Sequence, residues 1–332
     1  MGYRFSTALG IGLCLISGLA DAQGGNDFYA GRQIKMICAS DVGGGYDIYA
    51  RLLARHLGKH VVGKPSVLPI NMPGGAGISA ASYLAHNAVK DGTALLMIVQ
   101  TLPIVQVTRK GAARFDLAAF NWIGNMDDSA NVFISTRDSG IRTIEDARRS
   151  ELIVGSTSPN SIGGILPEVS NRLLGTKFNI VNGYKSGEAI DLALQRGEVN
   201  GRAGANWSAM KALRGGQFES GEINVFLQAG LRREPDLSDV PLLTDLASNE
   251  RDATILSFYS GMTALARAIA TTPGVPADRI ILLRSAFDAA MSDPALLDEA
   301  EKSGLQVRPL AGDKLQEIIE TMVKISPELL LP

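Results

Sequence analysis

The fold is decided by residues 34–47, which read IKMICASDVGGGYD. The apolar run 34–39 predicts a buried strand, and the amphipathic segment 46–57 predicts a helix. The three glycines between them allow the backbone to approach a ligand closely. The start of the helix presents unpaired N–H groups at the positive end of its dipole. This junction is therefore a candidate site for an anionic group.

The same arrangement recurs in residues 67–87. The strand-like run VLPIN at 67–71 leads into MPGGAG at 72–77 and then into a helix-like segment at 78–87. Neither turn is a nucleotide-binding fingerprint, because G-x-G-x-x-G would require glycine where the chain has Ile48, and no Gly-Lys-Ser/Thr follows. Two such turns in series predict one ligand site, although glycines that only turn the chain are the alternative.

The N-terminus has the features of a secretory signal peptide. Arg4 is followed by an apolar segment of 12 residues, 8–19, and then by Ala20-Asp21-Ala22, which has the form of a cleavage motif. The segment is too short for a membrane span, which needs about 20 residues. We expect residues 1–22 to be removed and the mature chain to act as a monomer in the periplasm.

The composition excludes several classes of protein. A formal net charge of −2 argues against a nucleic-acid-binding protein, which would need a basic surface. Cys14 would leave with the signal, so Cys38 alone remains and cannot form an intramolecular disulfide. Two of the three histidines, His56 and His60, would share a helix face, but no nearby carboxylate or thiol completes a metal site. We therefore expect no metal and no cofactor.

Strand-length apolar runs alternate with helical patterns along the mature chain, which is typical of an α/β fold with mainly parallel sheets flanked by helices. A longer extended passage at 123–135 interrupts this rhythm, and the tail from Pro276 is mostly helical. The length predicts two lobes. We assign residues 23–126 and 246–332 to the first lobe and 127–245 to the second, with the ligand cleft between them.

Ligands of open α/β sheets bind beyond the carboxyl ends of the strands, so the residues after each predicted strand are the candidate ligand-binding residues. No catalytic residue is predicted among them. In the first lobe they are Gly43, Gly44, Gly45, Tyr46, Asp47, Gly74, Gly75, Gly77, Gln100 and Thr101, and in the second Ser156, Thr157, Ser158, Asn160, Ser161, Tyr184, Lys185, Asn206 and Trp207.

Four of these residues have an alternative role. Asp47 can cap its helix or contact the ligand, and Tyr46 can cover the ligand or brace the loop. Lys185, the only basic residue in these predicted loops, can pair with a carboxylate or remain solvated. Trp207 can form an aromatic wall or belong to the core.

An exported serine hydrolase is the rival class. Ser208-Ala209-Met210-Lys211 fits S-x-x-K, and residues 185–187 resemble the K-T-G element of penicillin-binding enzymes. The order of the two elements is reversed, however, and neither a Ser-Asp-Asn element between them nor a G-x-S-x-G motif occurs. We therefore expect a protein without enzymatic activity.

The combination of motifs resembles a divergent branch of the substrate-binding receptors of tripartite tricarboxylate transporters, the Bug family of periplasmic solute-binding proteins. The resemblance implies a two-lobed clamshell of type II, which captures a small carboxylate through backbone amides and waters and delivers it to membrane-embedded transporter subunits. A receptor that senses the ligand without transport is a further alternative. The matching motifs are GGGYD at 43–47, ARLLA at 50–54, NMPGGAG at 71–77, KDGT at 90–93, GYKSG at 183–187, DVP at 239–241 and PGVP at 273–276.

Overall fold

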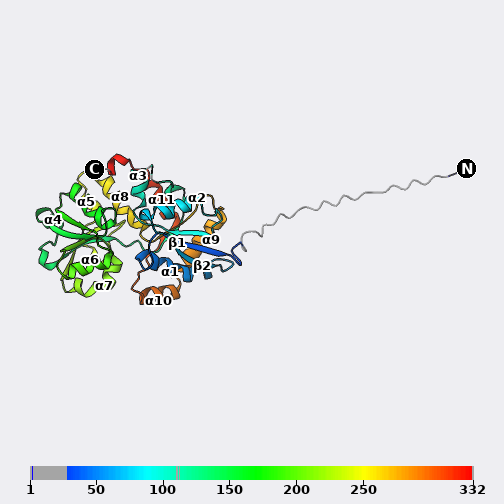
Figure 1. Cartoon of the computed structure of the whole chain (residues 1–332), viewed down its shortest axis with the longest axis horizontal. Helices are drawn as coiled ribbons and strands as arrows, with labels where there is room; N and C mark the ends of the chain where they lie inside the picture. The colour runs from blue at the N-terminus through cyan, green and yellow to red at the C-terminus, as the bar shows by residue number, and fades with distance from the viewer. Residues whose placement is uncertain (1, 3–27, 110, 112, 331–332) are drawn as a thin grey trace.

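The computed structural model describes residue 2 and residues 28–109, 111 and 113–330 (Figure 1). The predicted cleavage site after Ala22 lies outside the described residues, as does the predicted signal peptide apart from Gly2. Two β-sheets, each flanked by helices, form two lobes that lie side by side (Figure 1). Within the described ranges, every helix is too short or too polar to cross a membrane.

The first lobe is built on a six-stranded sheet of order β11-β4-β10-β3-β1-β2. Strand β1 pairs in parallel with β2 and β3, whereas β10 runs antiparallel between β3 and β4. Helices α1, α2, α9 and α11 contact these strands, and α10 packs on α1. The strands are β1 (Gln33–Cys38), β2 (Ser66–Asn71), β3 (Ala94–Met97), β4 (Asn121–Asn125), β10 (Ala268–Thr271) and β11 (Leu310–Ala311), and the helices are α1 (Gly45–Leu57), α2 (Ile78–His86), α9 (Ala277–Met291), α10 (Pro294–Lys302) and α11 (Gly312–Met322).

The second lobe is built on a five-stranded sheet of order β7-β6-β8-β5-β9. Strand β6 pairs in parallel with β7 and β8, whereas β5 runs antiparallel to β8 and β9. Helices α5, α6 and α7 contact its strands. The strands are β5 (Asn131–Thr136), β6 (Leu152–Ser156), β7 (Phe178–Asn182), β8 (Gly201–Asn206) and β9 (Ile223–Ala229), and the helices are α4 (Ile144–Arg149), α5 (Ile162–Leu174), α6 (Gly187–Gln195) and α7 (Trp207–Glu219).

The predicted α/β class and two-lobed architecture are confirmed, but both sheets are mixed rather than mainly parallel. The chain enters the second lobe through β5 and returns to the first through β10, and these are the strands that run antiparallel to their neighbours. Strands β5 to β9 all fall within the predicted range 127–245. The residues at which the two lobes divide stay a prediction.

Element boundaries differ from the sequence pattern where glycine and proline occur inside helices. The apolar pattern predicts a helix only over residues 166–174, but α5 begins at Ile162 and contains Gly163, Gly164 and Pro167. A Cβ atom on Gly164 would lie 2.4 Å from the Ser158 carbonyl oxygen, so close packing requires glycine despite its low helix propensity. The structure also has four helices for which the sequence pattern predicts no helix of its own: α3 (Leu102–Thr108), α4, α8 (Glu250–Gly261) and α12 (Pro327–Leu330).

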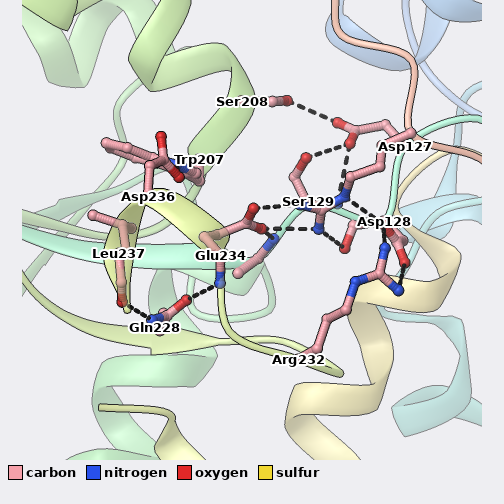
Figure 2. A network of polar contacts seen from close by, with 12 residues as sticks. Asp127, Asp128, Ser129, Trp207, Ser208, Gln228, Arg232, Glu234, Asp236 and Leu237 are labelled. Atoms are coloured by element: carbon pink, nitrogen blue, oxygen red, sulfur yellow. Dashed lines mark hydrogen bonds and ion pairs between the residues drawn. The ribbon is translucent and has the colours of Figure 1, made fainter. Parts of the chain in front are cut away.

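A polar cluster built around two buried carboxylates joins the two lobes at the passage from β4 to β5 (Figure 2). Arg308, which precedes β11 of the first lobe, donates from Nε to Asp128 Oδ1 (2.7 Å) and from Nη2 to Glu234 Oε1 (2.9 Å). Arg232 pairs with the other Asp128 oxygen at 3.0 Å. The Asp128 and Glu234 side chains are only 0% and 3% exposed. We call Asp128, Arg232, Glu234 and Arg308 the hinge cluster.

Candidate functional site

The first glycine turn joins β1 to α1 in the first lobe. Gly43 has φ +83°, a left-handed conformation that favours glycine, whereas Gly44 has φ −75°. Gly44 occupies the N-cap of α1 and offers no side chain to cap it. Within the described part of the chain, no acceptor binds the N–H groups of Gly45 and Tyr46. These two N–H groups remain available to an anion.

Asp47 is held inside the first turn by protein groups. Its carboxylate accepts hydrogen bonds from the Gly43 N–H (2.8 Å), from Arg51 Nε (2.9 Å) and from Asn71 Nδ2 (2.8 Å). Burial raises the pKa of Asp47, but the hydrogen bonds from Arg51, Gly43 and Asn71 outweigh it and lower the pKa below its usual value. The geometry favours the structural role of Asp47 over contact with the ligand.

We expect Asp47→Asn to cost about 1 kcal/mol of unfolding free energy at neutral pH, because its ion pair is partly solvated. Since the folded-state pKa is lowered, this contribution is present above the unfolded-state pKa of about 3.9 and is lost as the pH falls through the folded value. Urea unfolding of both proteins from pH 7 downward should show their difference shrinking below about pH 4. An unchanged difference at low pH would contradict this account.

The second glycine turn, between β2 and α2, is more strained than the first. Gly75, Ala76 and Gly77 all have positive φ, at +56°, +52° and +91°. A left-handed conformation is costly for alanine and tends to persist where the surrounding structure imposes it, often at binding sites. Gly77 is the N-cap of α2 and provides no side-chain cap.

This second turn lines a pocket between the two lobes. The pocket has a volume of about 320 Å³ and is lined by Gly75 and Thr101 from the first lobe and by Asn160 from the second. Arg109, at the end of α3, also lines it, and its Nη2 donates to Asn160 Oδ1 at 3.5 Å. The side chain of Ser161, at the N-cap of α5, makes no capping hydrogen bond. Three predicted residues thus share one interlobe pocket.

The serines that follow β6 are bonded mainly to one another. Ser156 Oγ lies 3.0 Å from Ser161 Oγ, and Ser161 Oγ donates to the Ser158 carbonyl oxygen at 2.8 Å. These contacts fix the loop in front of α5. In the same loop, Thr157 is partly buried and Asn160 is exposed.

The remaining predicted residues of the second lobe are dispersed. Lys185 is exposed, and Tyr184 packs beside Gly155. Trp207 is 6% exposed, packs edge to face on Phe218 and donates from Nε1 to Asp236, so it belongs to the lobe's own core. Asn206 contacts the passage between the lobes with its side chain, through a hydrogen bond to Asp127 (3.2 Å), and the backbone N–H of Trp207 donates to the Ala130 carbonyl oxygen of the same passage (2.8 Å).

The Ser208–Lys211 pair that suggested a hydrolase is not assembled. Ser208 is 2% exposed, and its hydroxyl group donates to Asp127 Oδ2 (2.9 Å), as Figure 2 shows. The ammonium group of Lys211 pairs instead with Asp236. In the described structure, the lysine that S-x-x-K requires as the partner of its serine is thus engaged by another residue.

Two arginines that the sequence did not single out lie among the predicted residues. Arg109 reaches the interlobe pocket from α3. Arg267, the residue before β10, places Nη2 3.2 Å from the position that a Cβ atom of Gly45 would occupy. The sequence missed Arg267 because we considered only residues after strands, whereas β10 is antiparallel and brings its leading end to the ligand edge.

Among the described residues, no group of three or more His, Cys, Asp or Glu side chains is arranged to hold a metal ion. His56 and His60 instead bind carboxylates of the first lobe, at 2.7 Å from Glu299 and 2.8 Å from Asp293. These contacts give the two histidines a structural role, since they tie α1 and the short 3₁₀ turn after it to α10 and its N-cap.

No family model matches the sequence, and no curated protein matches it. Solved structures do match, and three examples illustrate the likeness. A TctC solute-binding protein from Polaromonas, solved without ligand, is 18% identical with a TM-score of 0.67 over 91% of this chain and 99% of its own. MatC from Rhodopseudomonas palustris, with bound malate, is 16% identical with a TM-score of 0.62 over 90% and 99%. An R. palustris protein with adipate is 21% identical with a TM-score of 0.62 over 88% and 94%.

Identities this low establish the fold and not the ligand. The alignments nevertheless extend over nearly the whole of both chains, so they include both lobes and the returning C-terminal segment. The resemblance inferred from the sequence motifs is therefore confirmed at the level of architecture. The chain has the two-lobed fold of TctC-type solute-binding proteins.

Proposed function

We propose that the chain is a periplasmic receptor of the tripartite tricarboxylate transporter type, which captures a small carboxylate and delivers it to membrane-embedded transporter subunits. The observation that carries this proposal is the interlobe pocket of about 320 Å³, which Gly75 and Thr101 line from one lobe and Asn160 from the other. A ligand that touches both lobes stabilises the closed arrangement by its differential affinity for that state.

The chemistry of the helix starts supports an anionic ligand. Helices α1 and α5 begin at Gly44 and Ser161 without a side-chain cap in the described structure. At the start of α2 the glycine turn itself is the acceptor, since the N–H groups of Ile78 and Ser79 donate to its carbonyl oxygens. By contrast, α6 and α7 of the second lobe are capped by the side chains of Ser186 and Asn206. N–H groups at an uncapped helix start are suited to bind a carboxylate.

The likeness to proteins that hold malate and adipate supports the same ligand class. The pocket volume lies at the lower end of the range for small-molecule sites, about 300–1,000 Å³, which fits a small metabolite. We infer that mono-, di- or tricarboxylates of this size are the candidates.

We expect a carboxylate to raise the melting temperature of the purified mature protein. A ligand at ten times its dissociation constant adds about 1.4 kcal/mol to the unfolding free energy by mass action. Thermal-shift measurements with a panel of carboxylates, including malate and adipate, test this, and the matching amides serve as uncharged controls. Stabilisation by no carboxylate would contradict the proposal. Uptake of the bound carboxylate by cells with and without the protein separates delivery from sensing.

A further inference from the structure

Arg267 lies at the ligand edge of the first sheet. The antiparallel pairing of Ile269 with Met97 continues to the Ile98 N–H, which donates to the Ala268 carbonyl oxygen at 3.0 Å. This register places Arg267 opposite Val99, just beyond the carboxyl end of β3. The glycine turn that follows β1 lies at the same edge, since β1 and β3 are parallel neighbours.

The guanidinium group of Arg267 is fixed under that glycine turn. It stacks on the rings of Tyr46 and Tyr49 at 4.9 Å and 4.8 Å from their centroids. Nη1 donates to the Ala266 carbonyl oxygen at 2.6 Å, and Nη2 points to the space that a side chain on Gly45 would fill. Nε is buried and has no hydrogen-bond partner among the described residues. The group is thus rigidly placed but not fully satisfied.

The charge of Arg267 is not neutralised by the surrounding protein. No carboxylate in the described part of the chain lies within 4.0 Å of its nitrogens, whereas Arg51 and Arg308 each have such a partner. Burial, with a contribution from Asp127, raises the pKa of Tyr49 to about 12, so the phenol is neutral. A partly buried cation without an anion is costly, which indicates that its partner comes from outside the chain.

A second unsatisfied polar group lies beside the same tyrosine. Gln100 is 8% exposed, and its backbone N–H donates to the Tyr46 hydroxyl at 3.3 Å. Its side-chain Oε1 is buried and finds no hydrogen-bond partner in the part of the chain that the structure describes. Buried polar groups are normally paired, so two such exceptions next to one ring require an explanation. A polar ligand between the glycine turn and β3 accounts for both.

We propose that Arg267 forms a direct ion pair with the ligand carboxylate, beside the free N–H groups of Gly45 and Tyr46. This inference rests on the proposed function and deepens it. The resemblance implied capture by backbone amides and waters without an arginine. Here the planar guanidinium group can add charge-assisted, two-pronged hydrogen bonds, which distinguish a carboxylate from its uncharged amide.

The test is calorimetric titration of wild type, Arg267→Met and Arg267→Lys with the tightest-binding member of the carboxylate panel. We expect Arg267→Met to bind at least tenfold more weakly and Arg267→Lys to fall between the two, because lysine keeps the charge but not the planar fork. Arg279→Met is the matched control. Arg279 also stacks on an aromatic ring, that of Phe28 at 3.5 Å, and donates to the Asp91 carbonyl oxygen, away from the glycine turns. This control should bind as wild type does.

Each outcome has a distinct meaning. If wild type binds a carboxylate and Arg267→Met, folded by circular dichroism, binds it equally well, the ion pair is absent and the proposed function survives. If Arg267→Met does not fold, equal binding by Arg267→Lys and by a folded Arg267→Gln overturns the ion pair in the same way. If wild type binds no member of the panel, both the proposed function and this inference fail.

Discussion

Replacing Arg308 with methionine is expected to lower the free energy of unfolding by about 3–5 kcal/mol, the cost of leaving buried charge without its partner. Arg308 supplies Nη1 and Nη2 to the Glu234 carboxylate, which is 3% exposed. Without Arg308, the Glu234 carboxylate keeps only one of its described hydrogen bonds, the one that its Oε1 accepts from the Ala130 N–H (2.5 Å). Asp128 is less affected because Arg232 still pairs with it. Methionine keeps much of the apolar stem, so the loss reports mainly the charge.

Urea denaturation at neutral pH measures this effect. The matched control is Arg233→Met, since Arg233 forms a pair with Asp245 in which both side chains are well exposed, at 46% and 39%. Exposed pairs contribute about 0–1 kcal/mol, so the control should unfold almost as wild type does.

A double variant separates charge burial from packing. Arg308→Met combined with Glu234→Gln removes the unpaired carboxylate and should recover part of the lost stability. If the double variant is as unstable as the sum of the single ones, packing rather than an unpaired charge accounts for the loss. If Arg308→Met alone costs no more than Arg233→Met, the hinge cluster does not stabilise the fold.

The local part of the architecture could be predicted from sequence because its signals are local. The run 34–47 encodes strand, turn and helix in one continuous stretch, and the structure has β1, the glycine turn and α1 there. The ion pair between Asp47 and Arg51 could also be predicted from sequence, because residues four positions apart lie on the same side of a helix. The start of α5 could not be predicted in this way. Gly163, Gly164 and Pro167 have low helix propensity, and tertiary packing imposes the helix in spite of them.

The charged part of the candidate site could not be predicted from sequence for a different reason. Arg267 meets Gly45 and Tyr46 only because the chain returns from the second lobe as an antiparallel strand. Likewise, Arg308 contacts Asp128 and Glu234 across separations of 180 and 74 residues. No periodicity or motif spacing encodes such pairs. Searching only the loops after parallel strands found the backbone N–H groups and overlooked the arginine beside them.

The other large effect is expected at Asp127, where Asp127→Asn should lower the unfolding free energy by roughly 1.5–3 kcal/mol, the range for a hydrogen bond to a charged group. Asp127 is 0% exposed and acts only as an acceptor: Oδ1 receives the Ser129 N–H (3.0 Å), and Oδ2 receives Asn206 Nδ2 (3.2 Å) and Ser208 Oγ (2.9 Å). An asparagine must turn its NH₂ group toward one of these sets of donors. The Ser208 hydroxyl group can rotate, but the Ser129 N–H cannot.

Asn206 cannot relieve this conflict by turning its own amide, because its Oδ1 already accepts from the Ala209 N–H (3.1 Å) as the cap of α7. One donor therefore faces another in a buried site, whichever way the new amide turns. Asp298→Asn is the matched control, since Asp298 pairs with Lys302 on the surface, where both side chains are more than half exposed. Equal urea midpoints for the two variants would mean that the Asp127 charge is not needed. A loss confined to Asp127→Asn would identify this carboxylate as the acceptor that holds the passage between β4 and β5 against the start of α7.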